Sequence, residues 1–446
     1  MKNILLLTTL LLLSLPSIGK KPNIIVIMAD DLGYADLGFQ GSDRIPTPHL
    51  DALRARGVRF TDGHVTASVC SPSRAGLMMG RYQQRFGHHA NVPPKDKGMD
   101  PREVTLGEAL KPLGYATGFI GKWHLGASED RYPTKQGFDT FIGLRDGHRS
   151  YWYEPKGHDK PGSHKAIEHN GKQISFEGYV TDRMGDWSVD FIHEHKTKPF
   201  FLYVSFTAPH GPLHAKPEDL KTLETNNKYD AMVYNMDLNI GKIVTALEQH
   251  QLTAHTMIWF LSDNGGITAA ASNAPHTGRK GSAFEGGQRV PFIFAWPNVV
   301  QPNTTDHRLM SALDIFPTCL AAAGGDPHAH PRPLDGINLK PFLTGQQSGP
   351  IHPHLFWQRE NIASYRKGAW KLIRVDDQGV GLFDLSASPE ETNNLATEHP
   401  ERTQTMTHEL NQWINTLSEP TWREGKVWIP RRAAMHSKEY TPTPAP

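Results

Sequence analysis

The sequence predicts an α/β fold with a mostly parallel β-sheet and helices on both of its faces. Two observations lead to this prediction. Short apolar runs rich in β-branched and aromatic residues recur between residues 23 and 296, as expected of strands buried on both faces. Segments with apolar residues three and four positions apart separate several of these runs, and alternation of strand and helix is typical of parallel sheets.

The predicted strands are, in order, residues 23–29, 116–121, 199–206, 255–262 and 290–296. A helix is predicted after Thr47, because Pro48 follows this capping residue and Gly57 provides a stop. Two more helices are predicted within residues 105–114 and 228–249. Residues 143–178 are rich in Gly, Pro, His and aromatic residues, which indicates a long surface loop or insertion.

Four regions follow from these patterns. Residues 1–19 have a basic start, an apolar run and small residues, which predict a cleaved signal peptide and a secreted or periplasmic protein. The apolar run is too short and too poorly flanked to favour a membrane anchor. We expect the large α/β domain over residues 20–334, a smaller α+β domain with an antiparallel sheet over 335–435, and a disordered tail over 436–446.

The composition limits the partners. With 47 Lys and Arg against 46 Asp and Glu, the net charge of +1 favours neither nucleic acid nor membrane as a partner. The two cysteines, Cys70 and Cys319, could form a disulfide in an oxidising compartment. Cys319 lies in an apolar helical stretch and Cys70 in a polar turn, so a buried, inert thiol is the favoured interpretation of Cys319.

Polar side chains follow four of the predicted strands. They are Asp30 and Asp31, then Lys122 and His124, then His210 and His214, and finally Asp263 and Asn264. Because sites in parallel sheets form beyond the carboxyl ends of the strands, we expect these groups to gather. The oxygen ligands of the first and last pairs suit Ca²⁺ or Mg²⁺. The alternative for each aspartate is a cap on a helix or turn.

Basic groups complete this set. Lys122 and His124 point to the same side of an extended segment, although a solvated lysine and a satisfied histidine remain the alternative. Lys280 lies in a glycine-rich loop, which is equally typical of an anion site and of a flexible loop. Together with Arg74, these groups around a cation suit a tetrahedral oxyanion, and phosphate or sulfate ester hydrolysis is the reaction class.

The segment around Cys70 distinguishes between phosphate and sulfate ester hydrolysis. CSPSRAGLMMGR resembles the signature of the formylglycine-dependent sulfatases, in which Cys-x-Pro-x-Arg directs oxidation of the cysteine to an aldehyde. GYATGFIGKWHLG, PNIIVIMADDLGYADLG and LSDNGG resemble further segments of that family. The resemblance spans roughly residues 22–385 and implies an alkaline phosphatase-like core with a smaller C-terminal sheet domain.

The resemblance also implies the site. The metal, Ca²⁺ or alternatively Mg²⁺, would be bound by Asp30, Asp31, Cys70, Asp263 and Asn264. A maturing enzyme would convert Cys70 to formylglycine, whose hydrated form attacks sulfur. Arg74 and Lys122 would hold the nucleophile, Lys280 and His210 would bind sulfate and assist the leaving alcohol, and His124 would take the proton that lets sulfate depart.

The substrate is the least determined element. A sulfated poly- or oligosaccharide is expected, either a galactan of the carrageenan type or a galactosamine-containing glycan. Aromatic and cationic side chains that could contact it are Arg85, His88, His89, His148, Arg149 and Trp152. An ordinary polar loop is the alternative for them. A phosphodiester or phosphonate hydrolase of the same superfamily, or a non-catalytic binder of sulfated glycans, remain the alternative functions.

Overall fold

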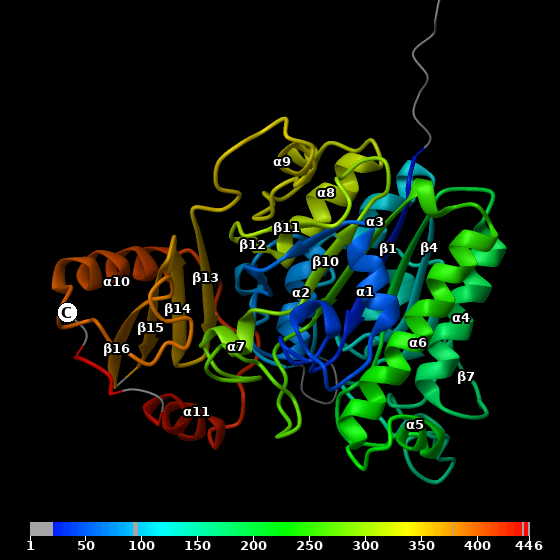
Figure 1. The fold of residues 1–446 in the computed structure, drawn as a ribbon, viewed down its shortest axis with the longest axis horizontal. Helices are drawn as coiled ribbons and strands as arrows, with labels where there is room; N and C mark the ends of the chain where they lie inside the picture. The colour runs from blue at the N-terminus through cyan, green and yellow to red at the C-terminus, as the bar shows by residue number, and fades with distance from the viewer. Residues whose placement is uncertain (1–20, 92–96, 377, 439–440, 445–446) are drawn as a thin grey trace, which may run out of the picture.

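The computed structural model describes residues 21–91, 97–376, 378–438 and 441–444. The signal peptide predicted at residues 1–19 lies outside the described residues. Figure 1 shows a large sheet covered by helices and, beside it, a smaller sheet built from the C-terminal part of the chain. In the part of the chain that is described, no helix is long and apolar enough to cross a membrane.

The large sheet has ten strands in the order β11-β2-β10-β9-β1-β8-β4-β5-β6-β7. Its centre is parallel: β9, β1, β8, β4 and β5 run in one direction, and β10 and β6 flank them antiparallel. The bounds are β1 Asn23–Ala29, β2 Val58–Phe60, β4 Ala116–Lys122, β5 Thr140–Leu144, β6 Glu168–His169, β7 Lys172–Gln173, β8 Phe200–Ser205, β9 Thr256–Ser262, β10 Phe292–Ala295 and β11 Thr304–Asp306. The mostly parallel sheet that the sequence predicts is thus confirmed.

Both faces of the sheet are buried, which explains why its strands are continuously apolar. In β1, Ile24, Val26 and Met28 belong to the core on one face, and Ile25 and Ile27 belong to the core on the other. The first core packs against α2 Cys70–Met79, α3 Leu106–Leu110 and α8 Ile315–Ala322. The second packs against α1 Pro48–Ala55, α4 Val180–His195 and α6 Lys228–Gln249. The predicted layering of helix, sheet and helix is confirmed.

The remaining elements that precede the smaller sheet are short. They are the parallel pair β3 Gly63–His64 and β12 Met310–Ser311, and the helices α5 Pro217–Thr222, α7 Glu285–Gln288 and α9 Lys340–Leu343. Single 3-10 turns are Gly38–Gln40, Gln83–Phe86, Lys111–Leu113, Glu129–Arg131, Pro133–Lys135, Thr253–His255, Ala312–Asp314 and Pro327–Ala329.

The smaller sheet is an antiparallel meander of β13 His354–Arg359, β14 Ile362–Lys367, β15 Trp370–Val375 and β16 Gly379–Asp384. The amphipathic helix α10 Pro400–Ile414 packs on it through Met406, Leu410 and Trp413. The antiparallel strands and helix α10 match the α+β pattern of the sequence, while the domain limits at residues 334 and 435 remain a prediction.

The structure differs from the expectation at the C-terminus. Helix α11 Trp428–Ser437 includes His436, and Thr443 exchanges both backbone hydrogen bonds with Val380 at the edge of β16. Residues 436–438 and 441–444 are therefore placed against the smaller domain, where a disordered tail was expected. Turn-forming and charged residues dominate this segment, and its contacts with Ala283, Gln378 and Val380 are distant in sequence, so a local pattern does not predict them.

Candidate active site

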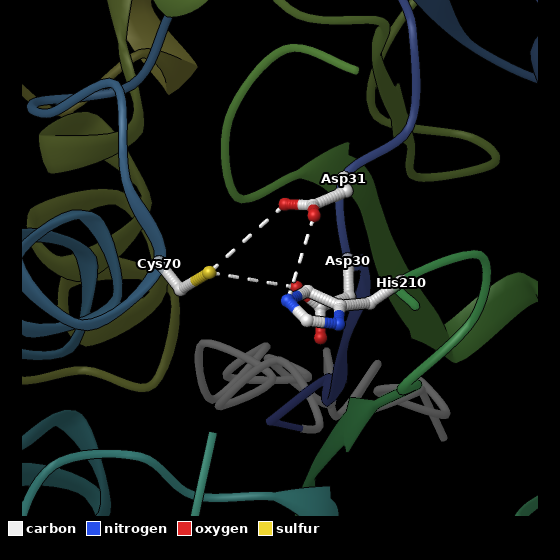
Figure 2. Close-up of side chains that lie close together, drawn as sticks. All are labelled: Asp30, Asp31, Cys70 and His210. Carbon is white, nitrogen blue, oxygen red and sulfur yellow. Dashed lines mark hydrogen bonds and ion pairs between the residues drawn. The ribbon is translucent and has the colours of Figure 1, made fainter. Parts of the chain in front are cut away.

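Two carboxylates follow β1 directly, as the position of the strand end predicts. The sulfur of Cys70 lies 3.7 Å from Asp30 Oδ1 and 4.0 Å from Asp31 Oδ1, as Figure 2 shows. Asp31 has φ of +66°, a left-handed conformation that costs a non-glycine residue roughly 1–2 kcal/mol. The surrounding contacts hold this strained backbone, which turns both carboxylates toward residue 70.

The second pair of oxygen ligands follows β9, the neighbour of β1. Asp263 accepts a hydrogen bond from the backbone N–H of Asp31 at 3.2 Å, and Asn264 Nδ2 donates to Asp31 Oδ1 at 2.7 Å. The strand ends of β1 and β9 therefore bring Asp31, Asp263 and Asn264 into direct contact, although more than 200 residues separate them in sequence.

Cys70 is the first residue of α2, and its side chain is buried. The N-terminal end of this ten-residue helix presents a partial positive charge to an anion. The N–H of Ser71 already donates to Asn91 Oδ1, that of Ser73 donates to the carbonyl of Val69, and Pro72 has no N–H. Burial by itself raises the pKa of the Cys70 thiol, but Lys122 and Lys280 outweigh it and lower the pKa to about 7. Cys319 is also a free, buried thiol, so the two cysteines form no disulfide; burial raises its pKa, as expected of an inert cysteine.

Arg74 lies one helical turn after Cys70, and all three of its guanidinium nitrogens donate hydrogen bonds. Its Nε and one terminal nitrogen donate to Asp263 Oδ2 at 2.9 and 2.7 Å, and the other terminal nitrogen donates to Ser205 Oγ. The Lys122 ammonium donates to Asp30 Oδ2 at 2.7 Å, with both side chains completely buried. These two cations neutralise carboxylates that would otherwise be buried without a partner.

Lys280 also contacts Asp31 and Cys70, and it lies in a loop that backbone hydrogen bonds hold in place. Its Nζ donates to Asp31 Oδ1 at 2.7 Å and lies 3.0 Å from the sulfur of Cys70. The loop is held by backbone bonds from Lys280 N to Gly266 O and from Gly281 N to Ser68 O. Because Gly266 follows β9 and Ser68 precedes α2, these bonds fix the loop between the two elements that carry the site.

Two histidines, His210 and His124, lie near these charged groups. His210 Nε2 lies 3.5 Å from Asp31 Oδ2. Burial disfavours its charged form, but Asp30 and Asp31 outweigh this and raise the pKa of His210 to about 9. Burial, together with Lys122 and Arg74, lowers the pKa of His124 well below its usual value, so this imidazole is neutral. Its buried Nδ1 has no hydrogen-bond partner among the described residues.

The donor set fits a hard divalent cation. One ligand atom from each of Asp30, Asp31, Cys70 and His210 lies within 4.8 Å of the others. The amide oxygen of Asn264 is buried and lacks a hydrogen-bond partner in the described part of the chain, which is costly unless a cation meets it. Carboxylate and amide oxygens are ligands that Ca²⁺ and Mg²⁺ prefer. Asp31 and Asp263 each accept from protein donors at both carboxylate oxygens in this structure.

A second acidic cluster has a different character. Asp62, His64 and Glu285 could each offer a ligand atom within the same short range. However, Glu285 already accepts from Lys371 Nζ at 2.8 Å, His64 Nε2 at 2.9 Å and Arg366 at 3.2 Å. These side chains occupy the carboxylate oxygens that a metal ion would need. Because Arg366 belongs to β14 and Lys371 to β15, the cluster links the large domain to the smaller sheet.

The side chains predicted to contact substrate fall into two groups. Four are bound inside the protein: Arg85 to Asp335, His88 to Ser71, His89 to the carbonyl of Ser418 and Arg149 to Asp159. With 0% side-chain exposure in both members, the Arg149–Asp159 pair is a structural ion pair. Their placement gives no support to a role in substrate binding.

His148 and Trp152 are placed differently. The His148 ring stacks on that of His210 with centroids 6.1 Å apart, and Lys165 Nζ lies 2.8 Å from its Nε2. Trp152 is 37% exposed and packs on Tyr179. His214, whose Nδ1 lies 3.3 Å from Ser150 Oγ, lines the same region. Contact of His148 and Trp152 with substrate stays a prediction, and their positions agree with it.

Sequence reasoning missed a group of residues beside Lys280. A cleft of about 1200 Å³ opens there, and Asn91, Arg279, Arg359, Trp422 and Trp428 are among its lining residues. Three of these come from residues 359–428, which the sequence pattern assigned to a separate domain. The density of Trp and Arg in WREGKVWIPRR was the available signal, since these types are enriched where proteins bind other molecules.

Comparison with known proteins adds to this geometry. The family model described as Sulfatase matches residues 22–325, and the model described as N-sulphoglucosamine sulphohydrolase, C-terminal, matches residues 279–419. Arylsulfatase G of Rattus norvegicus is 32% identical, with 85% of this chain and 84% of that protein covered. N-acetylgalactosamine-6-sulfatase of Canis lupus familiaris is 31% identical, with 81% and 74% covered.

A solved structure agrees over nearly the whole chain. Ps i-CgsB in complex with k-i-k-neocarrahexaose superposes with a TM-score of 0.85 at 34% identity, with 94% of this chain and 98% of that chain covered. Fold, sequence and the arrangement around residue 70 therefore point to the same family.

Proposed function

The chain belongs to the sulfatase family and is a sulfuric ester hydrolase, and from this premise we propose that it acts on a sulfated poly- or oligosaccharide through a formylglycine made from Cys70. The observation that carries the proposal is the position of Cys70. It begins α2, its sulfur lies within 4.0 Å of two carboxylates, and the Lys280 ammonium lies 3.0 Å away. Conversion of this cysteine requires a maturing enzyme as a partner.

Formylglycine supplies a hydrated aldehyde, whose one hydroxyl attacks sulfur and whose other provides an exit for the sulfate. An unmodified serine or thiol lacks this second hydroxyl, so its sulfated form would be a dead end. Arg74 and Lys122, on either side of Asp30, orient residue 70 through fixed contacts. The partial positive charge at the N-terminus of α2 also favours an anion next to residue 70.

The remaining groups have roles that follow from where they lie. Lys280 binds the sulfate, because its ammonium is the cation closest to residue 70. His210, next to Asp31, is placed to give a proton to the departing alcohol. His124, a neutral imidazole with a free buried nitrogen, accepts the proton that allows sulfate to leave residue 70.

A calcium ion, with magnesium as the alternative, completes the site in this proposal. Asp30, Asp31, Asp263 and Asn264 would hold it together with residue 70. When bound, the ion supplies positive charge that offsets the negative oxygens of the sulfate. The unpartnered amide oxygen of Asn264 is the observation that supports this assignment.

We propose a sulfated galactan of the carrageenan type as substrate. The support comes from Ps i-CgsB, whose structure holds a neocarrahexaose. A galactosamine-containing glycan is the second candidate, because N-acetylgalactosamine-6-sulfatase is 31% identical over 81% of the chain. Export through a cleaved signal peptide, predicted from residues 1–19, fits an enzyme that meets polysaccharides.

The test is a panel of defined sulfated oligosaccharides given to matured enzyme, with released sulfate as the readout. Sulfate release from carrageenan-type oligosaccharides supports the proposal, and release only from galactosamine sulfates moves the substrate to the second candidate. Turnover of phosphonate or phosphodiester analogues without turnover of any sulfate ester would overturn it. Tight glycan binding by matured enzyme without turnover would show a binder instead.

A further inference from the structure

The cleft beside Lys280 is larger than a site for one sulfated sugar. Its volume of about 1200 Å³ exceeds the roughly 300–1,000 Å³ typical of small-ligand pockets. Val69 and Lys280 belong to its lining, so the cleft opens next to Cys70, which follows Val69 in the chain. From there it runs between the Lys280 loop, the end of β13 and helix α11, which Figure 1 shows below the smaller sheet.

The charge of the cleft is strongly positive. Glu424 is the one acidic residue of its lining, and this carboxylate is bound by both Arg359 and Arg432. Arg279, Arg431 and Lys438 also line the cleft and are exposed. Within the ranges that the structure describes, no carboxylate forms an ion pair with these three side chains. They are therefore available to an external anion.

The cations Arg431 and Lys438 lie on one face at the C-terminal part of the chain, on and directly after helix α11. Trp428, Arg431, Met435 and Lys438 are three or four residues apart and all line the cleft. On another side of the helix, His436 accepts a hydrogen bond from Ala283 N–H at 2.9 Å and is completely buried. Because Ala283 belongs to the segment that carries Lys280, the helix is anchored next to the catalytic loop.

Trp428 provides an apolar surface among these cations. Its side chain is 48% exposed, and the Arg431 guanidinium lies 5.3 Å from its ring centroid. An exposed aromatic ring offers a flat surface for a sugar ring, and an adjacent guanidinium can bind a sulfate on that sugar. Apolar surface and unpaired positive charge thus occur together, which matches a sulfated saccharide better than a purely apolar ligand.

We propose that this cleft binds the sugar units next to the one being desulfated, with Trp428 stacking on a ring and Arg279 and Arg431 binding a second sulfate. The inference rests on the proposed function and makes it more specific. The enzyme prefers an extended chain with at least two sulfates over a sulfated monosaccharide. Helix α11, from the smaller domain, is then a determinant of specificity for chemistry performed in the large domain.

The test compares two substrates that carry the same target sulfate: a multiply sulfated carrageenan hexasaccharide and the corresponding monosaccharide sulfate. Trp428→Ala and Arg431→Ala are each expected to lower the ratio of kcat/KM for hexasaccharide over monosaccharide by about tenfold, through KM. The loss in Arg431→Ala should shrink as salt increases, because screening weakens the wild-type contact. Trp428→Phe retains an aromatic surface and should recover most of the ratio.

The matched control is the Trp370–Arg402 pair, which lies on the same domain but outside the cleft lining. The Arg402 guanidinium is 4.0 Å from the Trp370 ring centroid, and Arg402→Ala removes the same contact without changing the ratio. An unchanged ratio in both Trp428→Ala and Arg431→Ala would overturn the inference while leaving the proposed function intact.

A second measurement separates the two claims further. In a Cys70→Ala background, calorimetry measures binding of the hexasaccharide without turnover. We expect Arg431→Ala to weaken this binding by about tenfold, and a desulfated hexasaccharide not to compete. Equal binding of sulfated and desulfated chains would overturn the inference. If the matured wild type releases no sulfate from any glycan, the proposed function fails, and this binding measurement alone decides on the cleft.

Discussion

The ammonium of Lys280 lies 3.0 Å from the sulfur of Cys70, although 210 positions separate the two residues in the sequence. The loop of Lys280 is bonded through Gly281 N–H to the carbonyl of Ser68, two residues before Cys70. The backbone of the loop is therefore fixed next to Cys70, and the ion pair with Asp31 Oδ1 at 2.7 Å holds the ammonium in place. The contact places a positive charge at the position where we propose that the sulfate binds.

Cys70 and Cys319 form a matched pair for testing the nucleophile. We expect Cys70→Ala to abolish sulfate release, because alanine has no sulfur or oxygen on Cβ from which the aldehyde could be formed. Cys319→Ala should keep turnover, at a cost of about 1 kcal/mol in stability from the lost buried volume. Mass spectrometry of the Cys70 peptide after co-expression with a maturing enzyme should show formylglycine. Full activity with only unmodified cysteine would contradict this prediction.

Removal of divalent metal should abolish activity, and added Ca²⁺ should restore it. Calcium should also raise the melting temperature of the chelated protein, because a ligand that binds only the folded state stabilises it. Asn264→Ala removes the unpartnered amide oxygen and should reduce this calcium-dependent shift. Asn226→Ala, at an exposed position, is the control and should behave as wild type. Activity and melting temperature that are indifferent to chelation would refute the metal assignment.

Arg149 should matter for stability and not for substrate binding. Its ion pair with Asp159 at 2.7 Å is completely buried, so Arg149→Met leaves an uncompensated carboxylate and should cost about 3–5 kcal/mol. The double variant Arg149→Met/Asp159→Leu should recover much of this loss. Denaturant unfolding and KM are measured in parallel. A large increase in KM without loss of stability would instead place Arg149 at the substrate.

Glu285 should hold the two domains together. The carboxylate lies among Lys371, Arg366 and His64, all buried, and burial is outweighed by these cations so that its pKa is far below the usual value. Glu285→Gln leaves the cations without their counter-charge and should cost about 3–5 kcal/mol of unfolding free energy.

Glu409→Gln is the control for this variant. Glu409 forms a largely exposed pair with Lys367, with side-chain exposures of 30% and 47%, so its loss should cost less than about 1 kcal/mol. Equal unfolding free energies for Glu285→Gln and Glu409→Gln would show that the buried network contributes no more than a surface pair.

His436 should make the anchoring of α11 sensitive to acid. Its Nε2 accepts from Ala283 N–H and its Nδ1 lies 2.8 Å from the carbonyl of Arg432, which requires the neutral ring with the proton on Nδ1. Burial lowers the pKa of His436 to about 4. Between pH 6.5 and 4 the unfolded chain therefore binds more protons at this position, and stability falls as the pH falls.

The measurement is urea unfolding of wild type and His436→Gln at pH 7 and pH 4.5. The glutamine oxygen can accept the same N–H without titrating. The stability of wild type relative to this variant should decrease by about 2 kcal/mol on acidification. A difference that is independent of pH would show that the ring does not accept this bond.

The sequence by itself determined the sheet and the residues at its edge. Continuous apolar runs such as residues 23–29 predict strands buried on both faces, and the structure places them in the centre of a parallel sheet. Asp30, Lys122, His210 and Asp263 could be brought together in advance, because adjacent parallel strands end at the same edge. Local sequence patterns were sufficient here, because they predict where each strand ends, and neighbouring parallel strands end side by side.

Only the tertiary structure decided which cations are free to meet a substrate. Arg85 and Arg149 look like available charges in sequence, but Asp335 and Asp159 neutralise them. Arg431, which lies within the predicted smaller domain, lines the same cleft as Lys280 of the large domain. The physical reason is that an arginine can bind a substrate only if no carboxylate of the protein already pairs with it. Asp335 lies 250 residues from Arg85, and His436 anchors α11 through a bond to Ala283. Neither contact produces a periodic pattern in the sequence.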